Sequence, residues 1–221
     1  MPPPEQPKIY HIIHVDRLPS VLSAGCLWAD AEMLNRPNTG TIIGMDEIKQ
    51  RRLTELSLAS HPELYVGECV PFYFCPRSVM LYLIWQRNHP NLAYRGGEGP
   101  IVHLEADLRS AINWADQAGH RWAFTLSNAG ARYFEDRNSV EALQEINWAA
   151  VAAAKWSGPG VPLSVKDGKQ AEFLIERHFP WELVYRIGVR SLEIAQRVAA
   201  ALEGAGHRPE VELRKDWYYG G

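Results

Sequence analysis

Two polar side chains near the end of the chain, Gln170 and Glu172, have a spacing suited to chemistry on a sugar. Residues 169–176 are predicted to form a strand, and strand alternation points both side chains to one face, away from Ala171 and Phe173. A carboxylate held on a strand in this way could bind a ribose hydroxyl and stabilise the positive charge that develops when an anomeric bond breaks. The alternative is the solvated face of an edge strand, which the spacing alone favours.

A second candidate is the run Tyr10-His11-Ile12-Ile13-His14, which places two histidines in an otherwise apolar strand. Because they are three residues apart, they point to opposite faces, and one of them is expected to face a pocket or a partner. A histidine satisfied within the core or at its rim is the ordinary alternative.

Basic residues cluster in Ile48-Lys49-Gln50-Arg51-Arg52, on a predicted helix, and Arg77 and Arg95 are further candidates for contact with an anion. Guanidinium groups bind phosphate bidentately, so a pyrophosphate or a DNA backbone would be a natural partner. The alternative is a solvated helix face. Aromatic residues are frequent near these charges, and those that are exposed could stack unpaired bases, although most are expected in the core. They include Tyr73, Tyr82, Trp85, Trp122, Tyr133, Phe134, Trp148 and Trp156.

The composition favours one domain with no broad basic surface. At 221 residues, 46% hydrophobic and 22% charged, the chain can bury one ordinary core. A net charge of -3 argues against a protein that coats duplex DNA, because such binding needs many phosphate contacts. The apolar runs fall short of the roughly 20 residues that cross a bilayer, and the Pro-rich start is not a secretory leader, so a cytoplasmic protein is expected.

Several common catalytic signatures are absent from the sequence. There is no Gly-x-Gly-x-x-Gly, Walker-type Gly-Lys-Ser/Thr, Gly-x-Ser-x-Gly or His-Glu-x-x-His. Cys26, Cys69 and Cys75 lack the Cys-x-x-Cys spacing of a zinc or redox site, so reduced, largely buried thiols and no metal are expected.

The hydrophobic pattern predicts an α+β fold with a mixed or antiparallel sheet, because strands and helices alternate irregularly rather than as βαβ units. Asp16 is a possible N-cap, and Gly25 suits a left-handed helix end. Strands are expected at residues 9–14, 70–74, 101–104, 122–126, 169–176, 183–189 and 211–214, and helices at 18–24, 46–58, 79–86, 111–118, 140–155 and 192–202, with a loop at 59–69 and a turn at 127–130.

Three segments, in order along the chain, resemble the DarT family of DNA ADP-ribosyltransferases. They are Ile-Lys-Gln-Arg-Arg (48–52), Val-Pro-Phe-Tyr-Phe-Cys-Pro-Arg-Ser-Val-Met-Leu-Tyr (70–82) and Lys-Gln-Ala-Glu-Phe-Leu (169–174). With the N-terminal Tyr-His-Ile-Ile-His, the resemblance covers nearly the whole sequence. It implies one ADP-ribosyltransferase domain over residues 1–221, with a split mixed or antiparallel sheet, inserted helices and NAD⁺ in the cleft. It also implies a toxin whose partner antitoxin removes the modification.

The resemblance assigns roles to individual residues. Glu172 matches the catalytic glutamate, and the catalytic arginine is either Arg51 or Arg52. Because an arginine stays protonated at any ordinary pH, its role is to stabilise charge rather than to act as a base. The residues that match or flank the NAD⁺ site are His11, the backbone of Ile12 and Ile13, Tyr73 and Gln170.

The resemblance also implies an acceptor-reading loop at roughly 126–172. The substrate DNA should cross this loop. It must be single-stranded, because the reacting ring nitrogen of a base is paired or stacked in a duplex. Thymine is favoured as the acceptor, with guanine as the alternative. Candidate DNA contacts are Asn128, Arg132, Tyr133, Trp148 and Trp156.

Two departures from the family and two rival functions accompany this interpretation. Ile13 stands where the family often has Thr, and Val79 where it has Pro.

A transferase of the same fold that acts on RNA or protein, such as an RNA 2′-phosphotransferase, would share the NAD⁺ cleft. A catalytically silent nucleic-acid-binding module would not need NAD⁺. Under the transferase interpretation, Glu172→Ala should abolish transfer and leave the fold nearly intact.

Overall fold

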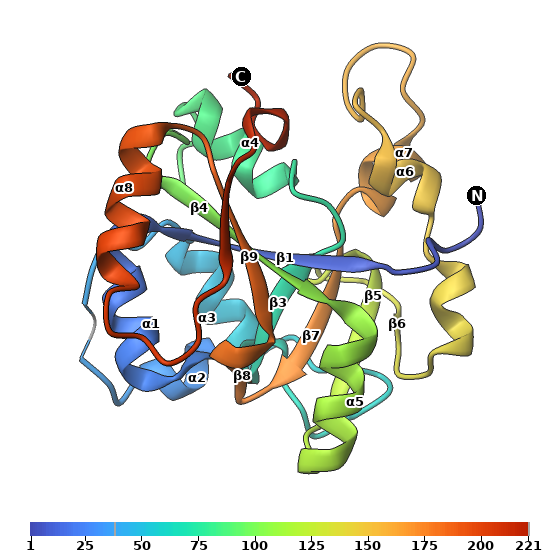
Figure 1. The fold of residues 1–221 in the computed structure, drawn as a ribbon. Coiled ribbons are helices and arrows are strands. Elements are labelled where there is room, and N and C mark those ends of the chain that lie inside the picture. Colours follow the sequence, from blue (N-terminus) through green and yellow to red (C-terminus); the bar gives the residue numbers. More distant parts are fainter. Residues whose placement is uncertain (38, 221) are drawn as a thin grey trace.

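The computed structural model describes residues 1–37 and 39–220, and its centre is a mixed sheet (Figure 1). Within the described residues this sheet has eight strands in the order β10-β9-β4-β1-β3-β7-β5-β6, and all neighbours are antiparallel except β10 and β9. The strands are β1 (Lys8–His14), β3 (Cys69–Tyr73), β4 (Ile101–Asp107), β5 (Trp122–Asn128), β6 (Asp136–Arg137), β7 (Ala171–Glu176), β9 (Val184–Val189) and β10 (Glu210–Leu213). A separate ribbon pairs β2 (Cys26–Trp28) with β8 (His178–Pro180).

The sheet is split between β1 and β3. Strand β1 pairs with β4 along its whole length, from Lys8 to His14, but its registered pairing with β3 among the described residues is limited to Tyr10 and Tyr73. The two halves, β10-β9-β4-β1 and β3-β7-β5-β6, therefore diverge on either side of one bridge. This arrangement confirms the predicted α+β fold with a split, mostly antiparallel sheet.

Helices cover both faces of the sheet. The helices are α1 (Leu18–Ala24), α2 (Asp30–Met33), α3 (Asp46–Thr54), α4 (Val79–Gln86), α5 (Leu108–Ala118), α6 (Trp148–Ala152), α7 (Leu163–Gly168) and α8 (Leu192–Ala201). The largest apolar cluster lies between the sheet and α1, α5 and α8, and includes Val21, Ile112 and Val198. A second cluster joins β1 to α4 through Ile12 and Leu81.

Several predicted elements are confirmed. Helix α4 begins after Ser78, whose hydroxyl accepts a hydrogen bond from the Leu81 amide at 3.2 Å. Gly25 ends α1 with φ at 68°, the left-handed conformation that glycine adopts without strain. The predicted alternation along β7 is also correct, because Ala171 and Phe173 belong to the large apolar cluster.

Three local predictions are wrong. Helix α3 ends at Thr54 rather than 58, because the following residues leave the helix so that Leu58 can be buried. Residues 140–155 do not form one helix. A 3-10 turn (Glu141–Glu145) is separated from α6 by Ile146, which is extended and buried, and by Asn147, which caps α6. Asp16 is not an N-cap but accepts hydrogen bonds from Thr41.

Candidate active site

Glu172 lies on an interior strand and is almost completely buried. Strand β7 has β3 on one side and β5 on the other, and Glu172 is 3% exposed. One carboxylate oxygen is 2.9 Å from Nη2 of Arg52, and the other accepts a hydrogen bond of 3.3 Å from the Ala129 amide. The solvated edge-strand alternative is therefore excluded. A buried carboxylate that a guanidinium holds in place can stabilise positive charge that develops nearby.

The last turn of α3 supplies both candidate arginines, and they have different partners. Arg52 pairs with Glu172, whereas Nη2 of Arg51 donates to the carbonyl oxygen of Gly130 at 2.7 Å. Consecutive helix residues point about 100° apart, so the two side chains diverge. Burial acts against the charge of Arg52, but Glu172, with smaller contributions from Tyr73 and Asp30, holds the pKa of Arg52 above its ordinary value. The geometry therefore separates two residues that the sequence could not distinguish.

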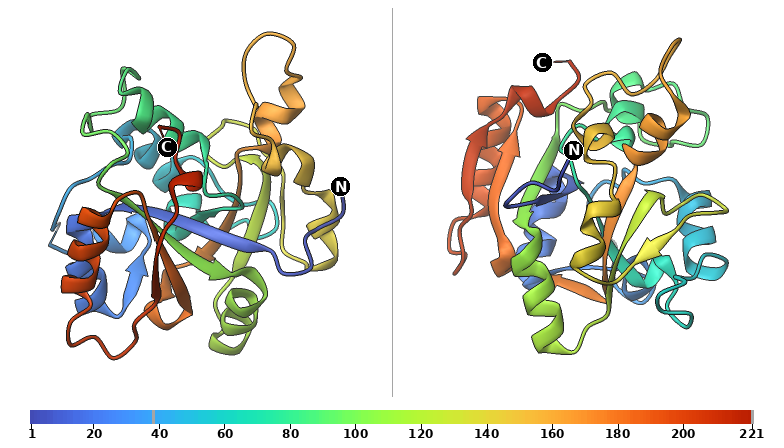
Figure 2. Two further views of the ribbon diagram at one scale, coloured as in Figure 1. Left: turned by 45° about the horizontal axis from the view of Figure 1, so that its top comes forward. Right: turned by 90° about the vertical axis from the view of Figure 1, so that its right-hand side faces the viewer.

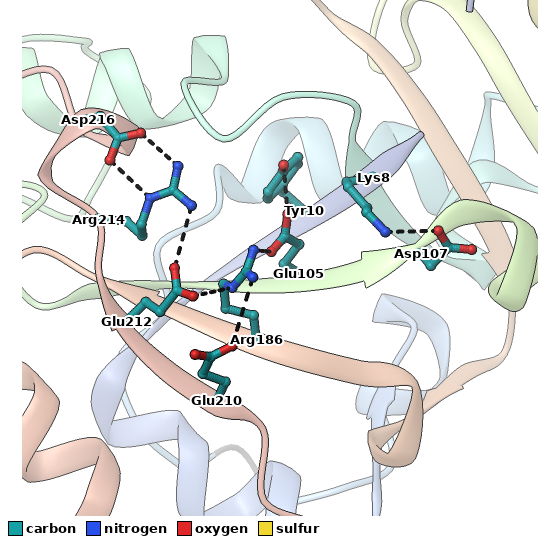
Figure 3. A network of polar contacts seen from close by, with 9 residues as sticks. All are labelled: Lys8, Tyr10, Glu105, Asp107, Arg186, Glu210, Glu212, Arg214 and Asp216. Atoms are coloured by element: carbon teal, nitrogen blue, oxygen red, sulfur yellow. Dashed lines mark hydrogen bonds and ion pairs between the residues drawn. The ribbon is translucent and has the colours of Figure 1, made fainter. Parts of the chain in front are cut away.

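Tyr73 lies beside Glu172, as its cross-strand partner on β3. Burial, followed by the negative charge of Glu172, raises the pKa of the Tyr73 hydroxyl. The phenol therefore remains protonated at neutral pH and is a hydrogen-bond donor. On its other side, Tyr73 is registered with Tyr10 of β1. The Tyr10 hydroxyl donates a hydrogen bond of 2.9 Å to Glu105, and Arg186 donates one of 2.8 Å to the same carboxylate (Figure 3). A polar row thus crosses the sheet and ends at Glu172.

His11 lies at the point where the sheet splits. Its Nδ1 is 2.7 Å from the carbonyl oxygen of Pro71 on β3. Burial lowers the pKa of His11, although the Pro71 carbonyl acts in the opposite direction. A neutral ring that donates its Nδ1–H to Pro71 leaves Nε2 as an acceptor. The side chains of Ile12 and Ile13 enter the apolar clusters on the two sides of the sheet, which leaves only their backbone for a ligand.

Asp30 and Lys49 also lie beside this site, and the sequence gave a possible role only to Lys49. They form an ion pair of 2.7 Å between α2 and α3. The charge of Asp30 acts on both His11 and Arg52, which places the ion pair near these two residues. No sequence signal identifies Asp30, because α2 is a single short turn. Lys49 was visible only as part of the basic run.

The turn after β5 brings Asn128 to Gln170. The Asn128 amide donates to Oε1 of Gln170 at 3.2 Å, and its oxygen accepts from the Gly130 amide at 2.7 Å. Gln170 therefore stands beside the turn that Arg51 also contacts. Tyr133 follows in the same segment and is 87% exposed, so its ring is free to contact a ligand.

Two other aromatic residues of the expected acceptor loop are buried. Trp148 packs on Phe74 and donates its ring N–H to the Leu143 carbonyl at 2.8 Å. Trp156 donates to the Tyr219 hydroxyl at 3.1 Å. Both rings dock this segment against the protein, so neither offers an open face to a base.

The described residues contain no group of His, Cys, Asp and Glu that could hold a metal ion. Cys26, Cys69 and Cys75 are free and buried, and burial raises the pKa of each thiol, to about 11 for Cys26. In the same part of the chain, every helix is too short or too polar to cross a membrane.

Comparison with known proteins gives consistent matches over the whole chain. The family model described as "ssDNA thymidine ADP-ribosyltransferase, DarT" matches residues 10–219. A DNA ADP-ribosyl transferase of Thermus sp. (strain 2.9) is 35% identical over 221 residues, which cover 98% of each chain. The solved structure of Thermus sp. 2.9 DarT in complex with ADP-ribosylated ssDNA is similar with a TM-score of 0.87, at 33% identity over 99% of both chains. The same protein in complex with NAD⁺ gives a TM-score of 0.82, at 32% identity over 98% of this chain and 100% of that one.

Proposed function

The chain belongs to the DarT family of DNA ADP-ribosyltransferases, and we propose that it transfers ADP-ribose from NAD⁺ to a thymine base in single-stranded DNA. The observation that carries this proposal is the buried Arg52–Glu172 pair, which stands beside Tyr73 where the sheet splits. In the reaction, the bond between the nicotinamide nitrogen and the ribose C1′ breaks and nicotinamide leaves. A ring nitrogen of the base attacks C1′ and loses its proton.

Glu172 is the residue that we assign to the breaking bond. Its carboxylate can accept a hydrogen bond from a ribose hydroxyl and stabilise the oxocarbenium-like sugar. Since the group is buried, its field is screened less than it would be in water. Arg52 fixes the carboxylate in place, so little reorganisation is needed when the charge on the sugar develops.

The residues at the split fit NAD⁺ as the substrate. Neutral His11 and protonated Tyr73 offer uncharged polar groups to the nicotinamide and its ribose. The backbone of Ile12 and Ile13, which pairs with β4 but lies beyond the single bridge to β3, is beside them. Lys49 and Arg52 supply positive charge for the pyrophosphate. Gln170 stands between this site and the acceptor turn.

We assign the acceptor to the segment that begins at Asn128. Arg51 holds the turn at Gly130, and the exposed Arg132 and Tyr133 offer a cation and a ring to an unpaired nucleotide. Trp148 and Trp156 then act by fixing this segment to the protein rather than by stacking on a base. A duplex would not react, because its base nitrogens are paired or stacked.

We further propose that residues 1–221 act as one transferase domain and that the protein is a cytoplasmic toxin. Its partner would be an antitoxin that removes ADP-ribose from DNA. The support is the DarT family match, which spans residues 10–219 and therefore both halves of the split sheet.

The acceptor can be identified directly. Purified protein is incubated with NAD⁺ and with single-stranded oligonucleotides that each contain one reactive base type, with matched RNA and duplex controls, and the products are weighed by mass spectrometry. A gain of one ADP-ribose on thymine-containing single strands alone is the expected result. A gain of ADP-ribose on guanine-containing strands would identify guanine, rather than thymine, as the acceptor. Labelling of RNA or protein but never of DNA would contradict the proposal.

A further inference from the structure

Arg77 lies beside a cluster of four aromatic rings at the edge of the acceptor segment. The cluster consists of Tyr82 and Trp85 of α4, Trp156 of the acceptor segment and Tyr219 near the C-terminus. Figure 2 shows α4, the α6–α7 region and the C-terminal segment gathered at one end of the molecule. We call these four residues the ring cluster.

The guanidinium of Arg77 has no polar partner in the part of the chain that the structure describes. Its central carbon lies 4.6 Å from the centre of the Tyr219 ring, and its Nε is buried without a hydrogen-bond partner. The buried carboxylate of Glu98 contacts the same C-terminal segment, but it is occupied by the amides of Tyr219 and Gly220 and by Arg190. Buried donors are normally satisfied, so an unpaired guanidinium is expected where an anion binds.

A second cation lies close by and is also without a carboxylate partner among the described residues. Lys169 is 4% exposed, and its ammonium donates to the carbonyl oxygens of Val151 and Ala153 at 2.6 and 3.0 Å. The charges of Lys169 and Arg77 both act on the Cys75 thiol, so both cations lie near Cys75. Two uncompensated cations make this end of the site attractive to a phosphate.

Arg77 follows the end of β3 that lies beside Glu172. Strand β3 runs from Pro71, which contacts His11 of the candidate NAD⁺ site, to Tyr73 beside Glu172. Arg77 comes four residues after Tyr73, whereas Pro71 comes two residues before it. The Cα atoms of Tyr73 and Arg77 are therefore at most about 14 Å apart. The ring cluster also includes Trp156, so the anion that reaches Arg77 lies next to the acceptor segment.

We propose that Arg77 and Trp85 form a subsite for a nucleotide next to the modified base. Arg77 binds the phosphodiester of that nucleotide, and Trp85 stacks its base. Trp85 is suited to this role because it is 38% exposed while its ring is stacked against Tyr219. The subsite rests on the proposed function, since it serves single-stranded DNA as the acceptor.

The test is the salt dependence of binding to fluorescent single-stranded oligonucleotides of two different sequences, without NAD⁺ so that no turnover occurs. Arg77→Gln is expected to weaken both complexes equally, by about tenfold at low salt, since one charge-assisted contact is lost. The slope of log K against log salt should fall in magnitude by about 0.7, the value for one phosphate contact of a single strand. Arg77→Lys should retain the slope but lose part of the affinity. Trp85→Ala should weaken binding by at least about fivefold.

Two controls separate this subsite from other causes. Arg208→Gln removes an exposed arginine beyond α8 and should leave both affinity and slope unchanged. The thermal shift produced by NAD⁺ should be the same in Arg77→Gln as in the wild type. A loss of NAD⁺ binding in that variant would overturn the subsite, because Arg77 would then serve the donor site or the fold. Unchanged DNA affinity and slope in Arg77→Gln would overturn the subsite alone. A wild-type protein that binds no single-stranded DNA at any salt would overturn the proposed function and the subsite together.

Discussion

Replacing Glu172 with Gln is expected to destabilise the protein as well as to inactivate it. The side chains of Arg52 and Glu172 are 13% and 4% exposed, and their charged atoms are 2.9 Å apart. Removing the negative charge leaves Arg52 buried without a counter-charge. Breaking a buried ion pair from one side typically costs about 3–5 kcal/mol of unfolding free energy. Gln preserves the volume and the acceptor for the Ala129 amide, so the loss reports mainly on the charge.

The assay is urea denaturation of the wild type, Glu172→Gln, Arg52→Gln and the double variant. The double variant should be more stable than the sum of the two single losses predicts, with a coupling energy of about 2 kcal/mol. Glu176→Gln is the matched control on the same strand. It breaks an ion pair with the more exposed Arg121 and should cost no more than about 1 kcal/mol.

A loss in Glu172→Gln of less than about 0.5 kcal/mol, or additive losses in the cycle, would refute this account of the ion pair. The expectation from the sequence was that Glu172→Ala would leave the fold nearly intact. The structure revises it, because a buried carboxylate that neutralises Arg52 stabilises the fold.

Three further predictions concern Arg51, His103 and Lys169. Arg51→Lys should raise the KM for DNA more than it lowers kcat, since Arg51 holds the acceptor turn at Gly130, and steady-state kinetics with varied oligonucleotide would show the reverse if Arg51 served the sugar. Burial lowers the pKa of His103 to about 4, from 6.5 in the unfolded chain, so the unfolded state binds a proton first on acidification. Unfolding free energy should therefore fall by about 3 kcal/mol as the pH is lowered from 6.5 to 4, and His103→Leu should flatten that part of the pH–stability curve. Lys169→Met should lower stability by about 2 kcal/mol and expose the chain after α6 to limited proteolysis, because Lys169 holds the carbonyl oxygens of Val151 and Ala153. An unchanged cleavage pattern would contradict this role of Lys169.

The sequence predicted the local chemistry of the site better than its environment. Alternation separated Glu172 from Ala171 and Phe173, which the structure confirms, but the strand begins at Ala171 rather than 169, so Gln170 lies just before it. The pattern within one strand does not determine strand order, however, and only the position of β7 between β3 and β5 shows that Glu172 is buried. The choice between Arg51 and Arg52 likewise depends on what each side chain meets across the fold.

Two of the errors have the same physical cause, since tertiary burial outweighed local propensity. Residues 140–155 have helical composition, but burying Ile146 and Trp148 interrupts the helix. Asp30 carries no pattern of its own and enters the site only because α2 packs against α3. Trp156 could have been an exposed stacking residue by sequence, and its contact with Tyr219 depends on a segment more than 60 residues away.

The most direct test of the central claim is a single-turnover reaction with NAD⁺ and a single-stranded oligonucleotide that contains one thymine, followed by mass spectrometry of the DNA and quantification of nicotinamide. Wild type and Glu176→Gln are expected to add one ADP-ribose per strand, with equal release of nicotinamide, and to leave the matching duplex unmodified. Glu172→Gln, assayed under conditions where it is folded, should react at least about 10²–10³-fold more slowly. Transfer by folded Glu172→Gln at a rate near that of the wild type, or no transfer to single-stranded DNA by the wild type, would contradict the account.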